Sequence, residues 1–119
     1  MKRKILIVED EQIISYLLES YINSLDCSKV IAIVDNGDDA IKITNEQEID
    51  FILMDVLIDG DKDGIETAEI INNNSKIPII YISGNSDPVT IERAKKTNMI
   101  GFLNKPIDKI DLTSIICNN

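Results

Sequence analysis

Four short apolar runs, each followed by polar or charged residues, constrain the fold of this chain more than any other feature. The runs are Ile5-Leu6-Ile7-Val8, Phe51-Ile52-Leu53-Met54, Ile77-Pro78-Ile79-Ile80-Tyr81-Ile82 and Gly101-Phe102-Leu103-Asn104. The residues that follow them are Glu9-Asp10, Asp55, Ser83 and Lys105-Pro106. Runs rich in Ile and Val are typical of parallel strands that are covered on both faces. The pattern therefore predicts an α/β fold built on a buried parallel sheet.

The segments between these runs have the features of helices. After the first run, apolar residues recur at helical spacing and predict one buried face. The members of this face are Ile14, Leu17, Leu18, Tyr21, Ile22 and Leu25. Asn36-Gly37 marks a turn into a second helix, which carries Ala40, Ile41 and Ile43.

Capping signals predict the remaining helices. Asp63 with Glu66 three residues later resembles a capping box and begins a helix that continues to about Ile71. Asp87-Pro88 supplies an N-cap and an N1 proline for a helix over residues 89–97. The apolar spacing in residues 107–116 predicts a last helix.

A further strand at residues 30–34 completes five strands that alternate with five helices. This alternation predicts a doubly wound, flavodoxin-like sandwich with right-handed crossovers and the strand order 2-1-3-4-5. The length of 119 residues fits a single domain over residues 1–119. In such sheets ligands bind beyond the carboxyl ends of the strands, at the switch between strands one and three. Glu9-Asp10 and Asp55 are expected on either side of that crevice.

The charge and hydropathy pattern excludes several classes of function. The net charge is −9, and the lysines and arginines form no stripe, so a nucleic-acid backbone would be repelled. No apolar run approaches the roughly 18 residues that span a bilayer. The basic residues Lys2-Arg3-Lys4 lead directly into a strand and then into charge, which is not the pattern of a signal peptide. We expect a cytoplasmic protein that binds neither nucleic acid nor membrane directly.

The content of cysteine and histidine restricts the chemistry further. Cys27 and Cys117 lack the spacing of metal ligands, and two cysteines in an intracellular domain are usually buried small hydrophobes, so we expect no role for them. Histidine is absent, which excludes Ser-His and Cys-His nucleophiles and the commonest zinc ligand. Any catalysis has to use carboxylates, hydroxyls and lysine.

The polar residues at the predicted sheet edge are suited to phosphoryl transfer. Three carboxylates, those of Glu9, Asp10 and Asp55, repel one another unless a cation neutralises them, and Mg²⁺ prefers a few carboxylates with waters and phosphate. With Mg²⁺ and Lys105 drawing charge from a phosphoryl group, Asp55 could attack phosphorus to form an acyl phosphate. The Ser83 hydroxyl could then donate to the bound phosphoryl group and move the following loop.

With these residues the whole chain resembles the receiver domain of the two-component response-regulator family. The matching pieces are residues 5–10 (ILIVED), 51–56 (FILMDV), 63–66 (DGIE), 79–84 (IIYISG) and 101–106 (GFLNKP). They occur in the family's order, and the resemblance as a whole covers residues 3–117. Their joint occurrence is far more specific than any one of them.

The resemblance implies a role for each residue of the site. It implies that Asp55 is the phosphoacceptor and that Glu9 and Asp10, with the Leu57 carbonyl, are ligands of Mg²⁺. Ser83 would be the switch hydroxyl and Lys105 the family's invariant lysine. Phe102 would be the aromatic switch residue, and Pro106 would follow a cis peptide bond. The domain would be a signalling switch that catalyses at most its own phosphorylation and dephosphorylation.

The resemblance also implies two kinds of protein partner. The phosphoryl donor would be a sensor histidine kinase, a phosphotransfer protein or a small phosphodonor, and it has to come from outside a chain that lacks histidine. A downstream protein would bind the face built from the fourth helix, the fifth strand and the fifth helix. The exposed residues of that face are expected to include Arg93, Lys96 and Asp111.

The loop after Asp55 departs from the family pattern and leaves alternatives open. Residues 58–62 contain no proline and are one residue longer than is usual, and Leu57 and Asn85 occupy positions that tune the lifetime of the phosphoryl group in the family. Asp59, Asp61 and Asp63 match the first half of a calcium-binding loop. However, position 12 of that loop, where a bidentate Glu is required, is Ile70, and a predicted strand stands before the loop in place of the entering helix. An aspartate-based phosphatase would need a second Asp as acid and base two residues after Asp55, and that position is Leu57. A receiver-like module that is never phosphorylated is the remaining alternative.

Overall fold

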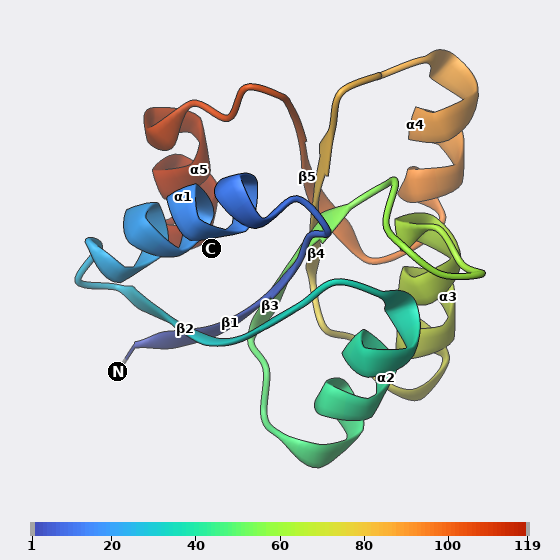
Figure 1. Cartoon of the computed structure of the whole chain (residues 1–119), viewed down its shortest axis with the longest axis horizontal. Coiled ribbons are helices and arrows are strands. Elements are labelled where there is room, and N and C mark those ends of the chain that lie inside the picture. The colour runs from blue at the N-terminus through green and yellow to red at the C-terminus, as the bar shows by residue number, and fades with distance from the viewer. Residues whose placement is uncertain (1, 119) are drawn as a thin grey trace.

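A five-stranded parallel sheet organises residues 2–118, the part of the chain that the computed structural model describes (Figure 1). The strands are β1 (Arg3–Val8), β2 (Ser28–Val34), β3 (Phe51–Asp55), β4 (Ile79–Ser83) and β5 (Met99–Asn104). Each strand is followed by a helix: α1 (Gln12–Asn23), α2 (Gly37–Glu46), α3 (Gly64–Asn74), α4 (Pro88–Lys95) and α5 (Lys109–Cys117). The order of the strands is β2-β1-β3-β4-β5, which confirms the predicted topology.

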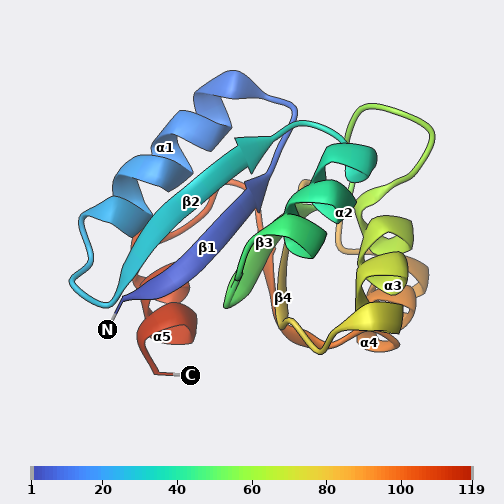
Figure 2. The same ribbon diagram turned by 90° about the horizontal axis from the view of Figure 1, so that it is seen from below.

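Helices cover both faces of the sheet, and this explains why the strands are apolar throughout. Helices α1 and α5 lie on one face, and α2, α3 and α4 lie on the other (Figure 2). Successive side chains of β1 alternate between the two cores, so that Ile5 and Ile7 pack beneath α1 and α5 while Leu6 and Val8 pack beneath the other three helices. Every residue of β3 and β4 is buried.

Helix ends follow the predicted capping residues. The Asp63 side chain accepts from the Glu66 N–H at 2.8 Å, and the Glu66 carboxylate accepts from the Asp63 N–H at 3.0 Å, which completes the capping box of α3. Asp87 caps α4, with Pro88 at its first position. Asn36 caps α2 by accepting from the Asp39 N–H at 2.9 Å. None of the helices in residues 2–118 is long and apolar enough to cross a membrane.

Several predicted boundaries and one helix face differ from the structure. β2 begins at Ser28 and β5 at Met99, each two residues earlier than predicted, whereas β4 begins at Ile79, after the proline that cannot donate to the ladder. The face of α1 is narrower than its apolar spacing indicated. Leu18 and Ile22 are fully buried, but Leu17 is 45% exposed, because Leu17 lies at the edge of the strip that contacts the sheet.

The two cysteines are joined by a disulfide, so the prediction that they have no role was wrong. Cys27 lies in the turn between α1 and β2, and Cys117 is the last residue of α5. They are 90 residues apart in sequence, and their Cα atoms are 5.8 Å apart. Spacing along the chain could not reveal this pairing, because the fold alone brings α5 back beside the end of α1.

Gly64 is the residue that allows α3 to begin directly against β3, and its replacement tests this packing. Its N–H donates to the Val56 carbonyl at 2.7 Å, and a Cβ added at Gly64 would lie well inside van der Waals contact of the Asp55 carbonyl oxygen. Since backbone cannot yield as a flexible side chain can, we expect Gly64→Ala to lower the free energy of unfolding by about 1–3 kcal/mol. Urea denaturation would measure this.

Gly84→Ala is the matched control, because a Cβ there would meet no atom within 4 Å. It should change the free energy of unfolding by less than about 0.5 kcal/mol. Equal effects of the two substitutions would contradict a steric role for Gly64.

Candidate functional site

Three carboxylates meet at the carboxyl edge of the sheet. Glu9 and Asp10 follow β1, and Asp55 is the last residue of β3, the neighbouring strand in which Met54 pairs with Val8. Each of the three offers an oxygen, and these oxygens lie within 4.8 Å of one another. Glu9 and Asp55 are almost fully buried, with relative exposures of 2% and 3%. The structure thus brings together the three acids that the sequence singled out.

The Lys105 ammonium group lies among these acids. Its Nζ donates to Asp55 Oδ2 at 2.9 Å and to Glu9 Oε1 at 3.2 Å. The backbone of this residue is anchored as well, since the Lys105 N–H donates to the Ser83 carbonyl at 2.8 Å. The Lys105-Pro106 peptide bond is cis, as the resemblance implied.

The second oxygen of Asp55 is held by the backbone that follows it. The Leu57 N–H donates to Asp55 Oδ1 at 3.2 Å, while the Leu57 side chain is 73% exposed and leaves the site. Asp55 is therefore oriented on one side by an ammonium group and on the other by a backbone amide. Both contacts hold the carboxylate at a fixed position.

One lysine does not neutralise the cluster. Burial, together with the hydrogen bond and the charge of Asp55, raises the pKa of Glu9 from 4.5 to about 8, although Lys105 opposes this shift. Glu9 Oε2 is buried and has no hydrogen-bond partner among the described residues. Burial tends to lower the pKa of Lys105, but its hydrogen bonds and ion pairs with Asp55 and Glu9 raise it overall. An excess of hard carboxylate oxygens around an orphaned acceptor fits a divalent cation such as Mg²⁺.

Two further acids at this edge were not predicted as part of the site. Glu11 Oε1 lies 3.6 Å from Lys105 Nζ, and it follows directly after the predicted acid pair. Asp59 lies beside Asp10, whose pKa is raised first by burial and then by the charge of Asp59. The only sequence signal for Asp59 was its place in the apparent calcium loop.

Ser83 lies at the same edge of the sheet, but its hydroxyl is engaged locally. It is the last residue of β4, one position after Ile82, which pairs with Asp55. Its hydroxyl donates to the Asn85 carbonyl at 2.5 Å and accepts from the Asn85 N–H at 3.0 Å. These bonds fix the turn that follows β4.

Phe102 belongs to the core rather than to the carboxylate cluster. It is half-buried in β5 and packs beside Tyr81, with the ring centroids 6.1 Å apart. The Tyr81 hydroxyl shares a hydrogen bond with Thr97 Oγ1 at 2.7 Å, and burial raises the pKa of Tyr81 to about 12. The ring of Phe102 is thus in contact with a residue that is tied to the end of α4.

The residues of the apparent calcium loop do not converge. Asp59 pairs with Asn36 in an isolated bridge, and Asp61 is bound to Lys62, which also holds Asp38 at 2.8 Å. Asp63 caps α3. Within residues 2–118, the only group of three acids close enough to hold a metal ion is that of Glu9, Asp10 and Asp55.

Arg93 was expected to be exposed, and it is instead partly buried against α3. Its guanidinium group forms an ion pair with Asp63 Oδ2 at 3.0 Å. Lys96 and Asp111 are exposed, as predicted. The ion pair fastens α4 to the N-terminus of α3.

This geometry is that of a signalling receiver fold, and comparison with known families agrees. Residues 5–117 match the family described as the response regulator receiver domain. The chain belongs to this family, whose members act as switches in two-component signalling.

Curated relatives that match this chain are about twice its length. The chain is 30% identical to the probable transcriptional regulator ycf29 of Porphyra purpurea, over 99% of this chain and 56% of the relative. It is 30% identical to the transcriptional regulatory protein MalR of Bacillus subtilis, over 87% of this chain and 44% of the relative. The chain therefore spans about half the length of the curated relatives it matches.

Solved receiver domains share the whole fold. The signal receiver domain of a modulated diguanylate cyclase from Desulfovibrio desulfuricans G20 is 32% identical with a TM-score of 0.90, over 99% of this chain and 93% of that chain. The receiver domain of sensor histidine kinase PA1611 from Pseudomonas aeruginosa PAO1 is 26% identical with a TM-score of 0.86, over 99% and 97% of the two chains. That structure contains a magnesium ion coordinated in its active-site cleft.

The raised pKa of Glu9 predicts an unusual dependence of stability on pH. A carboxyl group whose pKa rises from 4.5 to about 8 on folding stabilises the protein fully below pH 4.5, and this contribution is lost as the pH rises through 8. Because the chain lacks histidine, no side chain with an ordinary pKa titrates between pH 5 and 8. Urea unfolding without divalent ions should therefore show stability falling from pH 5 to pH 8.

Glu9→Gln should remove most of this slope, because the amide does not titrate. The exposed Glu46 supplies a control, Glu46→Gln, which should keep it. An unchanged slope in Glu9→Gln would show that another group is responsible.

Proposed function

We propose that the chain, as a single receiver domain over residues 1–119, is a phosphoacceptor switch in which Asp55 takes up a phosphoryl group. The observation that carries the proposal is the position of the Asp55 carboxylate. It is buried at the carboxyl edge of the sheet, 2.9 Å from the Lys105 ammonium group and beside two further acids. A carboxylate oriented from two sides is placed for in-line attack on phosphorus, which depends mainly on positioning and charge neutralisation.

The transfer itself needs an external donor. An Asp55 oxygen forms a bond to phosphorus, the bond from phosphorus to the donor breaks, and the leaving group departs with the electron pair and is protonated from solvent. Lys105 would pair with the phosphoryl oxygens as its contact with Asp55 loosens. Because the sequence contains no histidine, a phosphohistidine donor has to lie outside it. The donor would be a sensor histidine kinase, a phosphotransfer protein or a small acyl or amide phosphate.

The acid group would hold Mg²⁺. The ligands would be carboxylate oxygens of Glu9, Asp10 and Asp55, together with the Leu57 carbonyl. When bound, the ion would supply the positive charge that the single lysine does not, and it would neutralise the charge on the transferring oxygens. The orphaned Glu9 Oε2 and the raised pKa of Glu9 both support a cation here.

Phosphorylation would be transmitted through the turn after β4. The Ser83 hydroxyl would exchange its bonds with Asn85 for a phosphoryl oxygen and draw this turn towards Asp55. Phe102 would follow, because movement of the turn and of α4 alters its packing beside Tyr81. A downstream protein would read the resulting change on the face formed by α4, β5 and α5. This chain would act in the cytoplasm, without direct contact with nucleic acid or membrane.

The decisive experiment is intact-mass measurement after incubation with acetyl phosphate or phosphoramidate and Mg²⁺. We expect one phosphoryl adduct in the wild type and none in Asp55→Asn. Asp61→Asn is the matched control, since this aspartate side chain is 80% exposed and pairs with the neighbouring Lys62 away from the acid cluster, and it should keep the adduct. The absence of an adduct with every donor would favour an interaction module that is never phosphorylated.

A second measurement tests the metal site alone. If the affinity for Mg²⁺ is on the order of 1 mM, about 10 mM Mg²⁺ adds roughly 1.4 kcal/mol to the free energy of unfolding, because the ion binds only the folded site. Asp10→Asn should abolish this gain, and Asp61→Asn should retain it. Stabilisation by Ca²⁺ that is lost in Asp61→Asn would point instead to the loop of residues 59–63.

A further inference from the structure

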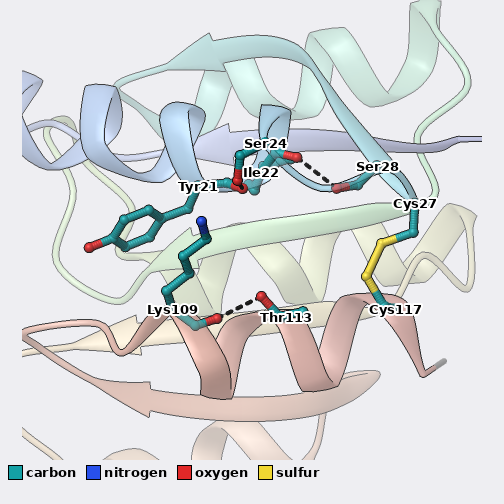
Figure 3. The surroundings of a disulfide bond; sticks show 8 residues. All are labelled: Tyr21, Ile22, Ser24, Cys27, Ser28, Lys109, Thr113 and Cys117. Atoms are coloured by element: carbon teal, nitrogen blue, oxygen red, sulfur yellow. Dashed lines mark hydrogen bonds between the residues drawn. A yellow bond between two sulfur atoms is a disulfide. The ribbon is translucent and has the colours of Figure 1, made fainter.

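The disulfide between Cys27 and Cys117 is the covalent link between the two halves of one helical layer. It joins the turn after α1 to the end of α5, and both helices cover the same face of the sheet (Figure 3). These are the only two cysteines in the chain. Nothing in the proposed phosphoryl chemistry uses them.

The turn that carries Cys27 is held rigidly by hydrogen bonds. The Ser24 hydroxyl donates to the Tyr21 carbonyl at 2.7 Å, and the buried Ser28 hydroxyl donates to the Ile22 carbonyl at 3.0 Å (Figure 3). The Cys27 carbonyl accepts from the Arg3 N–H at 2.8 Å, which ties the turn to β1. Opening the disulfide would therefore leave this side of the link in place.

The other side of the link is the last turn of α5. Lys109 Nζ, in the first turn of α5, lies 5.8 Å from the centre of the Tyr21 ring, and Leu112 in the middle of the helix is buried. In the last turn Ile116 is buried and Ile115 packs against the same core. Cys117 ends the helix and is exposed. The disulfide secures the last turn of α5 in addition to this packing.

The cores of the domain do not depend on a covalent staple. Two clusters of buried apolar residues cover the two faces of the sheet, and domains of this size commonly fold without disulfides. Disulfides that are exposed are also the more easily reduced ones. The combination of an exposed Cys117 with a self-sufficient core favours a reversible link.

From this arrangement we propose that Cys27 and Cys117 form a reversible thiol–disulfide pair that fastens or releases the end of α5, and that a dithiol reductant of the thioredoxin type opens it. The reductant's thiolate attacks the exposed Cys117 sulfur, the S–S bond breaks, and Cys27 leaves as a thiolate that takes up a proton. The reductant's second thiol then displaces Cys117 from the mixed disulfide. The protein gains two electrons and two protons, and the reductant becomes a disulfide.

The redox state of the cysteine pair would then change the surface of the domain independently of phosphorylation. Opening the pair would loosen the last turn of α5 without unfolding the domain, because Leu112 remains packed against the sheet. As α5 belongs to the face that we propose for output, the redox state would alter the surface that a partner contacts. The redox step itself does not depend on phosphorylation.

The test compares the oxidised and the thioredoxin-reduced protein without any phosphodonor. Mass spectrometry after thiol alkylation should find no free thiol in the protein purified without reductant, and two thiols that appear together after treatment. Amide hydrogen exchange over residues 113–118 should become at least tenfold faster on reduction, while β3 should not change. The melting temperature should fall by roughly 10 °C, since the link closes a long loop.

Variants separate this inference from the proposed phosphorylation. Cys117→Ser should show the fast exchange at residues 113–118 without reductant and no response to thioredoxin, and Asp55→Asn should respond as the wild type does. Reduced and alkylated wild-type protein serves the same purpose if the serine variant folds poorly. Free thiols in the untreated protein, a pair that thioredoxin leaves closed, or identical exchange in the two states would each overturn the proposal.

Discussion

The burial of carboxylates around a single ammonium group is the interaction on which the functional edge of this protein depends. Glu9 and Asp55 are almost fully buried, and both accept from Lys105 Nζ, at 3.2 and 2.9 Å. Removing charges from water costs several kcal/mol for each ion unless partners compensate. Lys105 compensates only in part, and the imbalance is visible in the raised pKa of Glu9 and in its Oε2 atom, which has no hydrogen-bond partner within residues 2–118. This excess of carboxylate oxygens favours a further cation at the same edge.

The sheet makes this arrangement possible. Because all five strands are parallel, their carboxyl ends lie at one edge, and residues from β1, β3, β4 and β5 meet there although they are far apart in sequence. The cores on both faces fix the strands, and the Lys105 backbone bond to Ser83 aligns the ends of β4 and β5. The two apolar cores therefore stabilise the fold, whereas the carboxyl edge of the sheet retains unbalanced negative charge.

Much of the fold could be predicted because its signals are local. The continuous apolar runs indicated strands covered on both faces, and the Asp63–Glu66 capping box was confirmed as the start of α3. Boundaries were less certain where the chain gives no local signal, as at Ser28 and Met99. The exposure of Leu17 and the pairing of Arg93 with Asp63 were missed, because each depends on the angle at which a helix packs on its neighbours.

The sequence by itself determined the strand order and most of the polar residues at the sheet edge, because the periodicity of apolar residues and the short connections leave few alternative topologies. Only the tertiary structure decided how those residues are paired. It placed the Lys105 ammonium group between Glu9 and Asp55, turned the Ser83 hydroxyl towards Asn85, and set Asp59 beside Asp10. It also joined Cys27 to Cys117 across 90 residues. Side-chain contacts of this kind depend on distances in space, which the packing of helices on the sheet sets and which sequence spacing does not encode.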